Sequence, residues 1–218
     1  YTLIELFPKH YQELVLICDN GGVIMDRGQI VAKNLLPNQA IQEMCATVLA
    51  QTDGRPMICA IDGAIAQTGD EQYDAVYREF YRELAYREDL TSWQGEADKV
   101  TIYLPHGDSE QVFEQVINPH FGAQFSAAVS GPDWIDIMPK NVNKGTAMAE
   151  IGRRRGITAD AMMAFGDTFN DAQMLSFVKY GYLVANANPG MRQYAQLHTA
   201  SNDEYGVVKV IDQVLAAQ

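Results

Sequence analysis

Hydrophobic residues recur along this chain with two spacings, which predict a mixture of helices and strands. Between residues 38 and 50 the apolar side chains have the i, i+3, i+4, i+7 spacing of one helix face, and the same spacing crosses residues 70–88. Apolar runs at 14–18 and 56–61 are short and bounded by turn residues, as strands are. The pattern is that of an α/β protein.

The first 35 residues predict one helix and a small group of strands. A helix is expected over residues 2–13, followed by the strand at 14–18. Asp26-Arg27-Gly28 separates two further apolar runs, at 23–25 and 29–31, which indicates a hairpin.

From about residue 36 to residue 138, strands outnumber helices. Strands are expected at 99–104, 125–129 and 134–138, and Asp108 is the expected cap of the helix that follows it. This order predicts a separate α+β module built on an antiparallel sheet.

After Pro139 the two kinds of element alternate regularly, which predicts a parallel sheet covered by helices on both faces. The expected helices are 143–155, 170–178, 189–197 and 205–217, and the expected strands are 161–165, 182–185 and 198–200. The last helix is expected to bury Val207, Ile211, Val214 and Leu215.

The two ends of the chain are therefore interpreted as one α/β core made of residues 1–35 and 139–218. Residues 36–138 are interpreted as a domain inserted into that core.

The composition of the chain limits the kinds of molecule that it is expected to bind. Apolar residues make up 47% and charged residues 20% of the chain, as in globular proteins. A formal net charge of −12 argues against nucleic acid and against anionic membranes, but small phosphorylated molecules need only local positive potential. Cys18, Cys45 and Cys59 lie in apolar segments without metal or redox spacing, so reduced thiols and a cytoplasmic location are expected. The sequence leaves the oligomeric state open.

Candidate chemistry is concentrated where the apolar run 161–165 ends in Gly166-Asp167. Asn170 and Asp171 open the next helical pattern, which places two carboxylates and an amide at the carboxyl end of a strand, where open α/β sheets bind ligands. Asp167 is a hard oxygen ligand suited to Mg²⁺. For Asp171 the residues alone leave two interpretations open, because the helix dipole favours an acid at a helix start whatever the function.

Lys144 lies in the first turn of the helix predicted over 143–155. A lysine there opposes the helix dipole, and an ammonium beside a helix N-terminus would hold a phosphate. A solvated surface lysine is the alternative, and the presence of Asp167 in the same pattern favours the phosphate site.

Asn20 follows the strand at 14–18 in the sequence Asp19-Asn20-Gly21-Gly22. It either points at the ligand-binding edge of the sheet or belongs to a tight turn with positive φ, and the residues do not decide between the two.

Four segments together resemble the haloacid dehalogenase superfamily, most closely its Cof-type sugar phosphatases of subfamily IIB. Asp19-Asn20-Gly21-Gly22 looks like the Asn-Gly turn after the second core strand of the family. Asp136 to Ala147, with Lys144, resembles the third motif of the family, and Phe165 to Leu175, with Gly-Asp-Thr-Phe-Asn-Asp, resembles the fourth. Ser201 to Val207 is similar to the closing Asn-Asp-x-x-Gly-Val segment. The resemblance implies a Rossmann-like parallel-sheet core with an inserted type-IIB cap.

The resemblance also implies a reaction, phosphoryl transfer through an aspartyl-phosphate with Mg²⁺ as cofactor. Lys144 and Asp171 would be catalytic, and Asp167 and Asp171 would bind the metal. Asn170, Lys144 and Asn20 would contact the phosphate or the rest of a small phosphorylated substrate.

The sequence departs from the family at its first two motifs. No Asp-x-Asp-Gly-Thr is found in the 218 residues, and no Thr or Ser motif after a following strand. The nearest imitation, Ala60-Ile61-Asp62-Gly63-Ala64, has alanine at the nucleophile position and is interpreted as a strand and turn of the inserted domain. Because the chain begins at Tyr1 without Met, we expect the missing strand and helix of the core, and the nucleophile, to lie upstream. The 218 residues alone are expected to bind phosphate weakly and to turn over nothing.

Two other classes of function compete with a phosphatase. A non-catalytic phosphate-binding or interaction protein, a relic without its first strand, would explain the absent nucleophile. A receiver-like signalling domain shares a parallel sheet with an acidic edge, but it does not accommodate an inserted block of this size.

Overall fold

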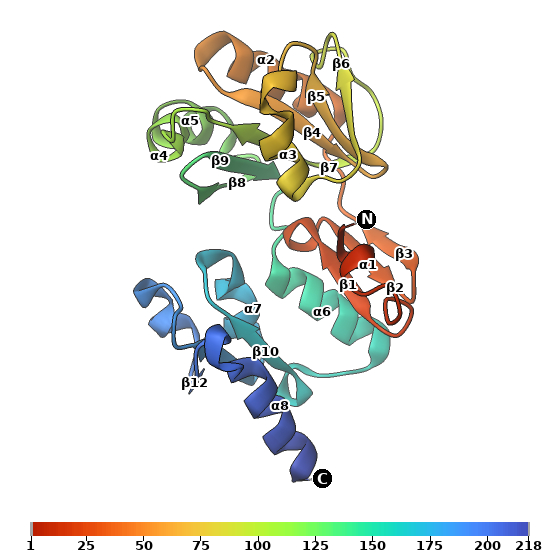
Figure 1. The fold of residues 1–218 in the computed structure, drawn as a ribbon, viewed down its shortest axis with the longest axis vertical. Helices are drawn as coiled ribbons and strands as arrows, with labels where there is room; N and C mark the ends of the chain where they lie inside the picture. The colour runs from red at the N-terminus through yellow and green to blue at the C-terminus, as the bar shows by residue number, and fades with distance from the viewer. Residues whose placement is uncertain (1, 218) are drawn as a thin grey trace. The chain divides into compact units, whose positions relative to one another are not determined.

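The computed structural model describes residues 2–217 and divides into two compact units, Tyr1–Val142 and Asn143–Gln218 (Figure 1). The division of the chain into a core with an inserted domain remains a prediction, and each unit is described here by itself. None of the helices in residues 2–217 has the length and apolar character that a membrane crossing requires.

The first unit opens with a short helix and a three-stranded antiparallel sheet. Helix α1 (Thr2–Leu6) ends well before residue 13, so the longer helix expected there is wrong, and residues 7–14 form turns. Strands β1 (Val15–Cys18), β2 (Val23–Asp26) and β3 (Gln29–Lys33) pair in sequence order, which confirms the predicted hairpin.

A six-stranded sheet makes up the rest of the first unit, in the order β6-β5-β4-β7-β9-β8. Its neighbours pair antiparallel except β5 with β6, which confirms a largely antiparallel sheet. The strands are β4 (Arg55–Ala60), β5 (Gly63–Gln67), β6 (Leu84–Arg87), β7 (Ala97–Tyr103), β8 (Ser126–Gly131) and β9 (Trp134–Met138).

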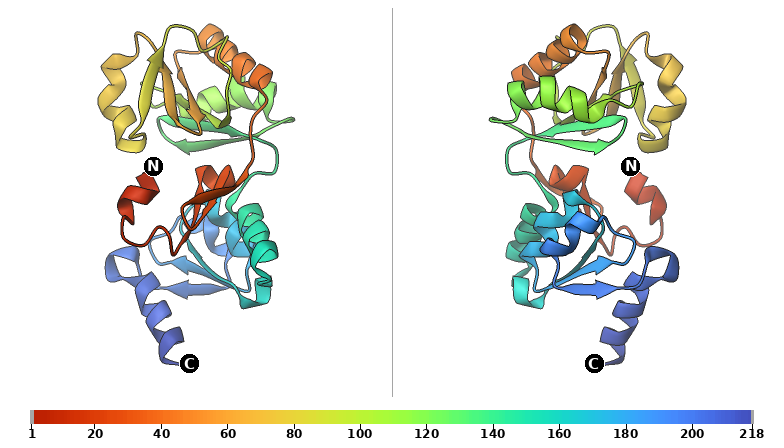
Figure 2. Two further views of the ribbon diagram at one scale, coloured as in Figure 1. Left: turned by 90° about the vertical axis from the view of Figure 1, so that its right-hand side faces the viewer. Right: turned by 90° about the vertical axis from the view of Figure 1, so that its left-hand side faces the viewer.

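Helices cover both faces of this sheet (Figure 2). Helix α2 (Asn38–Gln51) packs on one face together with the helical stretch 109–121, which comprises α4 (Ser109–Val112), a π-helical turn and α5 (Asn118–Phe121). Helix α3 (Asp74–Phe80) packs on the other face through Tyr77. Asp108 precedes α4 as expected, but its side chain makes no capping hydrogen bond.

The helix expected over residues 70–88 is wrong in its second half. Helix α3 ends at Phe80, and Leu84 to Arg87 form strand β6, parallel to β5. The aromatic residues that suggested one continuous helical face belong to two elements that meet over the same apolar cluster, where Tyr73 and Tyr77 pack with Tyr86. Strand β5 was not expected either, because its small residues give no strand signal.

The second unit contains the predicted parallel sheet. Strands β10 (Met163–Gly166), β11 (Tyr180–Val184) and β12 (Leu197–Thr199) pair parallel in that order. Helix α6 (Lys144–Arg155) precedes β10, α7 (Ala172–Phe177) lies between β10 and β11, and α8 (Gly206–Ala216) follows β12. A 3₁₀ helix at Pro189–Tyr194 lies between β11 and β12. Leu175, Leu183 and Met191 lie in the core that these elements enclose.

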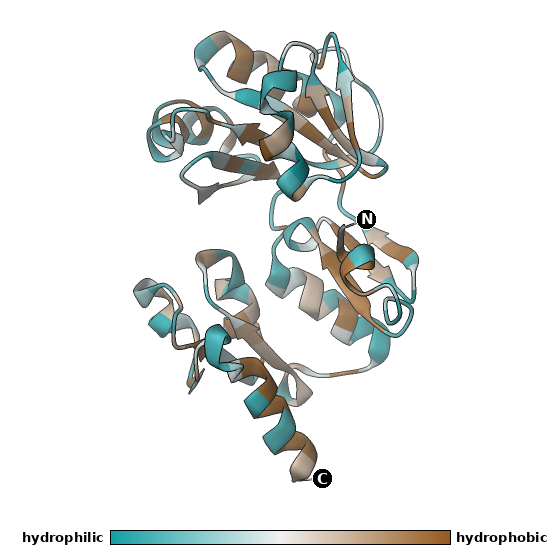
Figure 3. Cartoon of the chain, in the orientation of Figure 1, coloured by the Kyte–Doolittle hydropathy of each residue, from teal (hydrophilic) through white to brown (hydrophobic). Residues whose placement is uncertain are grey.

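Helix α8 does not bury the residues expected of it. Its buried members are Gly206 and Val210, Val207 is half-buried, and Ile211, Val214 and Leu215 are exposed. Figure 3 shows apolar and polar residues alternating along this amphipathic helix. The sequence pattern identified the helix correctly but not the partner that its apolar face would need.

Two features fix helix α6. A cap determines where the helix begins, and a glycine allows its close contact with α7. Asn143 Oδ1 accepts a hydrogen bond from the Thr146 amide at 2.9 Å, and the Thr146 hydroxyl accepts one from the Asn143 amide at 3.1 Å. A Cβ on Gly145 would lie 2.7 Å from the backbone carbonyl of Gln173, so only glycine allows the two helices to approach this closely. Both features fix the position of Lys144.

Replacing the cap tests its contribution to this unit. Asn143→Ala should lower the free energy of unfolding by about 1 kcal/mol, because the Thr146 amide loses its partner. Asn143→Ser should retain most of the stability, because serine caps helices nearly as well. Denaturant unfolding followed by circular dichroism measures both, and equal stabilities for the alanine and serine variants would contradict the assignment.

Candidate active site

The site is built at the carboxyl end of β10, where the chain leaves the sheet and turns into α7. Gly166 ends the strand, Thr168 caps a 3₁₀ turn (Phe169–Asp171), and Asp171 precedes α7. A Cβ on Gly166 would lie 2.6 Å from the Cβ of Asp171, so glycine leaves the room in which the Asp171 side chain folds back under the strand end.

Asp171 is the centre of the site. It is 4% exposed, and its two oxygens are bound from two sides. Its Oδ1 accepts a hydrogen bond from Lys144 Nζ at 2.6 Å, and its Oδ2 accepts one from the Asp167 amide at 3.0 Å. One carboxylate therefore joins the first turn of α6 to the loop that carries Asp167.

The electrostatics of Asp171 follow from these contacts. Burial by itself raises the pKa of Asp171, but the hydrogen bonds from Lys144 and from the Asp167 amide outweigh burial, so the pKa lies below its usual value. Asp171 is therefore ionised at neutral pH, and Lys144, whose side chain is 30% exposed, keeps access to solvent. The ion pair leaves a cationic group at the surface of the site.

Thr168 belongs to the site although its residue type was not singled out from the sequence. Its hydroxyl lies 2.7 Å from Asn170 Oδ1 and 3.2 Å from Asp167 Oδ1, and its single proton serves one of these acceptors at a time. The signal was present, because Thr-x-x-Asp from Thr168 to Asp171 has the spacing of a capping box, which the structure contains.

Four of the five predicted site residues are brought together at this strand end, namely Lys144, Asp167, Asn170 and Asp171. Asn20 lies in the other unit, in the turn after β1. That turn has positive φ at Asp19, Asn20 and Gly21, which confirms the turn geometry that the sequence left open. Whether Asn20 also contacts a ligand remains a prediction.

The residues of the site supply part of a magnesium site. Asp167 is exposed, and its carboxylate accepts a hydrogen bond from the Thr168 hydroxyl, whereas both oxygens of Asp171 are already engaged. Among the described residues no three His, Cys, Asp or Glu side chains form a metal-binding group. Mg²⁺ binds proteins through one or two carboxylates and completes its shell with water and substrate phosphate, so Asp167 fits as one ligand.

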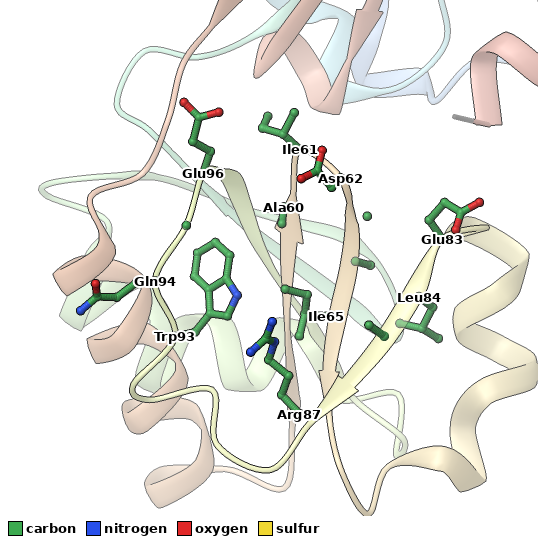
Figure 4. A pocket seen from close by; sticks show the side chains of 14 residues that line it. Ala60, Ile61, Asp62, Ile65, Glu83, Leu84, Arg87, Trp93, Gln94 and Glu96 are labelled. Atoms are coloured by element: carbon green, nitrogen blue, oxygen red, sulfur yellow. The ribbon is translucent and has the colours of Figure 1, made fainter.

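A pocket of about 450 Å³ lies in the first unit, along β4, β5, β6 and the segment 93–96. Figure 4 shows Asp62 at the turn that ends β4, with Trp93 and Arg87 farther along the pocket. Asp62 thus belongs to a hairpin turn of the six-stranded sheet, which confirms its interpretation as a strand and turn. No residue of the Lys144 site lines this pocket.

The Asp171 contacts predict a pH-dependent stability. Because the pKa of Asp171 is lowered in the folded state, its carboxylate stabilises the fold above the ordinary pKa of about 4 and loses this effect as the pH falls through the lowered value. Asp171→Asn should lower the free energy of unfolding by about 1.5–3 kcal/mol at pH 7, and by clearly less at acid pH. Urea unfolding at pH 7 and pH 3 measures the difference.

The matched control is Asp160→Asn, which changes an exposed aspartate of the same unit. It should leave stability nearly unchanged at both pH values. A loss for Asp171→Asn that is equally large at pH 7 and pH 3 would show that the carboxylate charge contributes nothing.

Comparison with known proteins identifies the family. Residues 1–211 match the family described as haloacid dehalogenase-like hydrolase. The 5-amino-6-(5-phospho-D-ribitylamino)uracil phosphatase YbjI of Escherichia coli (strain K12) is 24% identical over 216 residues, which are 99% of this chain and 79% of that protein. The matches to three further phosphatase-named relatives span 47%, 35% and 34% of the length of those proteins.

Solved structures agree with the family match. SMU.1108c from Streptococcus mutans UA159 superimposes with a TM-score of 0.89 at 27% identity, over 98% of this chain and 81% of that one. The subclass IIB sugar phosphatase BT4131 has a TM-score of 0.75 at 19% identity, over 92% of this chain and 75% of that one, which shows a common fold. Since the family match spans nearly the whole sequence, this chain belongs to the haloacid dehalogenase-like hydrolases and has the α/β fold of their subclass IIB.

Proposed function

We propose that this chain carries the lysine, the metal-binding carboxylate and the phosphate-contacting amides of a magnesium-dependent phosphatase for small phosphorylated metabolites. The observation that carries the proposal is the Lys144–Asp171 ion pair, 2.6 Å long, beside Asp167 at the carboxyl end of β10. A cation, an exposed carboxylate and the side-chain amide of Asn170 at one strand end are among the groups that phosphoryl transfer uses.

Each side chain has a separate role in this proposal. Lys144 neutralises charge on the phosphate and on the nucleophile, and Asp171 holds its ammonium in place. Asp167 is a ligand of Mg²⁺, which when bound offsets the negative charge of the phosphoryl group. Asn170 and Asn20 donate amide hydrogens to the phosphate. The metal role expected of Asp171 is here reduced to support of the metal-binding loop, because both its oxygens already accept hydrogen bonds.

The nucleophile lies outside these 218 residues in this proposal. The sequence contains no Asp-x-Asp-Gly-Thr, and Asp62, its nearest imitation, lies in the β4–β5 turn. A second carboxylate beside Asp167 would also complete the magnesium site, since Asp167 is the one exposed carboxylate among the four residues assembled there. The same missing residue therefore accounts for both the nucleophile and the second metal ligand.

The substrate class is proposed from the relatives. YbjI acts, by its name, on a phosphorylated ribityl compound, and BT4131 is named a sugar phosphatase. We infer a sugar phosphate or a phosphorylated sugar alcohol as substrate. The free thiols of Cys18, Cys45 and Cys59 support a reducing location for the reaction, namely the cytoplasm.

The test uses the complete gene product, including whatever is encoded before Tyr1. With a generic aryl phosphate and Mg²⁺ it should release phosphate, and Asp167→Ala should lower kcat/KM at least about 100-fold, because a lost metal ligand costs several kcal/mol. Asp160→Ala, which changes an exposed aspartate in the 3₁₀ turn Ala159–Ala161 before β10, should leave the rate unchanged. Equal rates for Asp167→Ala and the unmodified protein would contradict the assignment.

The absent nucleophile also favours one other candidate, a phosphate-binding protein without catalysis. It predicts that the complete gene product releases no phosphate from any ester but still binds inorganic phosphate, and that Lys144→Met abolishes this binding. Phosphate release in the first assay excludes this candidate.

A further inference from the structure

A lysine ammonium is buried among acidic side chains in the first unit. The side chain of Lys99, on β7, is only 9% exposed, and its Nζ lies 2.9 Å from Asp19 Oδ1 and 3.6 Å from Asp136 Oδ1. Asp136, on β9, also accepts a hydrogen bond from the Ser130 hydroxyl at 2.8 Å. Burial alone would lower the pKa of Lys99, but the surrounding acidic groups hold it above its usual value. The ammonium is therefore charged and held between the turn after β1 and strand β9.

Asp19 is the first residue of the turn that carries Asn20. The φ angles of Asp19, Asn20 and Gly21 are 46°, 53° and 110°, so three successive residues are left-handed. Non-glycine residues adopt this conformation only at a cost in free energy, and they keep it where surrounding contacts impose it. The turn is also held by Asn34, the residue after β3, whose Nδ2 donates to the Gly21 carbonyl at 2.9 Å.

The other end of the turn meets a second side chain of β7. The pairing of β7 with β4 shifts register between Cys59 and Ala60, which leaves Asp98 at a bulge. A Cβ on Gly22 would lie 2.1 Å from Asp98 Oδ2, so the carboxyl group fills the space that glycine leaves open. Asp98 is 2% exposed, and its Oδ2 has no hydrogen-bond partner within residues 2–217.

The surroundings of Asp98 favour its neutral, protonated form. Burial, and then the nearby charge of Asp19, raise the pKa of Asp98 to about 7. The raised pKa favours the neutral carboxyl group against Gly22, which reduces repulsion between Asp98 and Asp19. Strand β7 contacts the turn at both ends, by an ion pair at Asp19 and by close packing at Gly22.

We propose that Lys99 and Asp98 are positioning residues that clamp the Asp19–Gly22 turn and thereby fix the direction of the Asn20 side chain. The role of that direction in catalysis rests on the proposed function, in which Asn20 contacts the substrate phosphate. The clamp itself is independent of it. The bulge in β7 allows the side chains of two adjacent residues, Asp98 and Lys99, to contact the same turn.

The experiment replaces Lys99 by methionine in the complete gene product, which removes the charge and keeps most of the volume. Two readouts are followed, the ¹³Cα chemical shift of Asn20 and the KM and kcat for an aryl phosphate with Mg²⁺. Lys99→Met should move the Asn20 shift away from the left-handed range. It should also raise KM about tenfold while kcat changes less, because the phosphate contact is made in the ground state and the transition state alike.

The matched control is Lys33→Met, which removes the ammonium of another ion-paired lysine of the same unit, bound to Glu96. It should leave the Asn20 shift and KM unchanged. A folded Lys99→Met protein with an unchanged Asn20 shift would overturn the clamp. If the unmodified protein releases no phosphate, the proposed function fails, while the chemical shift still decides on the clamp.

A second pair of variants tests the clamp if Lys99→Met does not fold. Gly22 has φ −61° and ψ −43°, so the backbone there accepts alanine, and the three atoms nearest to the added Cβ all belong to Asp98. Gly22→Ala should displace the Asn20 shift, and the double variant Gly22→Ala with Asp98→Ala should return it toward the original value. Failure of the double variant to restore the shift would show that Asp98 does not hold the turn.

Discussion

The candidate site depends on one buried carboxylate. Asp171 has almost no contact with solvent, so its charge is tolerated only because Lys144 and the Asp167 amide supply hydrogen bonds to its two oxygens. The same bonds fix the lysine on α6 relative to the loop after β10. Removing Asp171 would free both partners at once. Lys144 and Asp167, 23 positions apart in the sequence, lie close together because both bind this one carboxylate.

The two units use a similar device at two strand ends. In the second unit a lysine is paired with an aspartate in the turn after β10, and in the first unit Lys99 is paired with Asp19 in the turn after β1. Each pair joins a turn to another element of its unit, α6 for Asp171 and β7 for Asp19. One partner of each pair is buried, namely Lys99 or Asp171, so the pair loses less of its attraction to solvent screening than a surface pair does. The residues proposed to contact phosphate, Asn170 and Asn20, lie in these two turns.

The sequence was sufficient wherever a local pattern and the tertiary structure agree. The alternation after Pro139 predicted the parallel sheet, and the residue types of Lys144, Asp167, Asn170 and Asp171 predicted the site that the second unit assembles. These residues follow strand or helix ends that turn residues mark, so their places could be read from spacing alone.

The sequence was insufficient where packing between distant segments determines the secondary structure or the burial of a residue. Strand β6 carries aromatic residues that continue the spacing of α3, and only its pairing with β5 makes it a strand. The burial expected for Ile211 and Leu215 requires a covering partner that a helical pattern does not specify. Lys99 and Asp98 gave no signal, because a charged pair at the start of a strand is usually solvated, and their contacts with Asp19 and Gly22 span about eighty residues of sequence.

The central claim, that the Lys144–Asp171 ion pair assembles the site, is tested most directly by a double-mutant cycle on the free energy of unfolding. Lys144→Met, Asp171→Asn and the double variant are compared with the unmodified protein at pH 7 and low ionic strength. The account predicts a coupling free energy of at least about 1 kcal/mol between the two residues, as for contacting groups in one hydrogen-bond network. Strictly additive effects would contradict it.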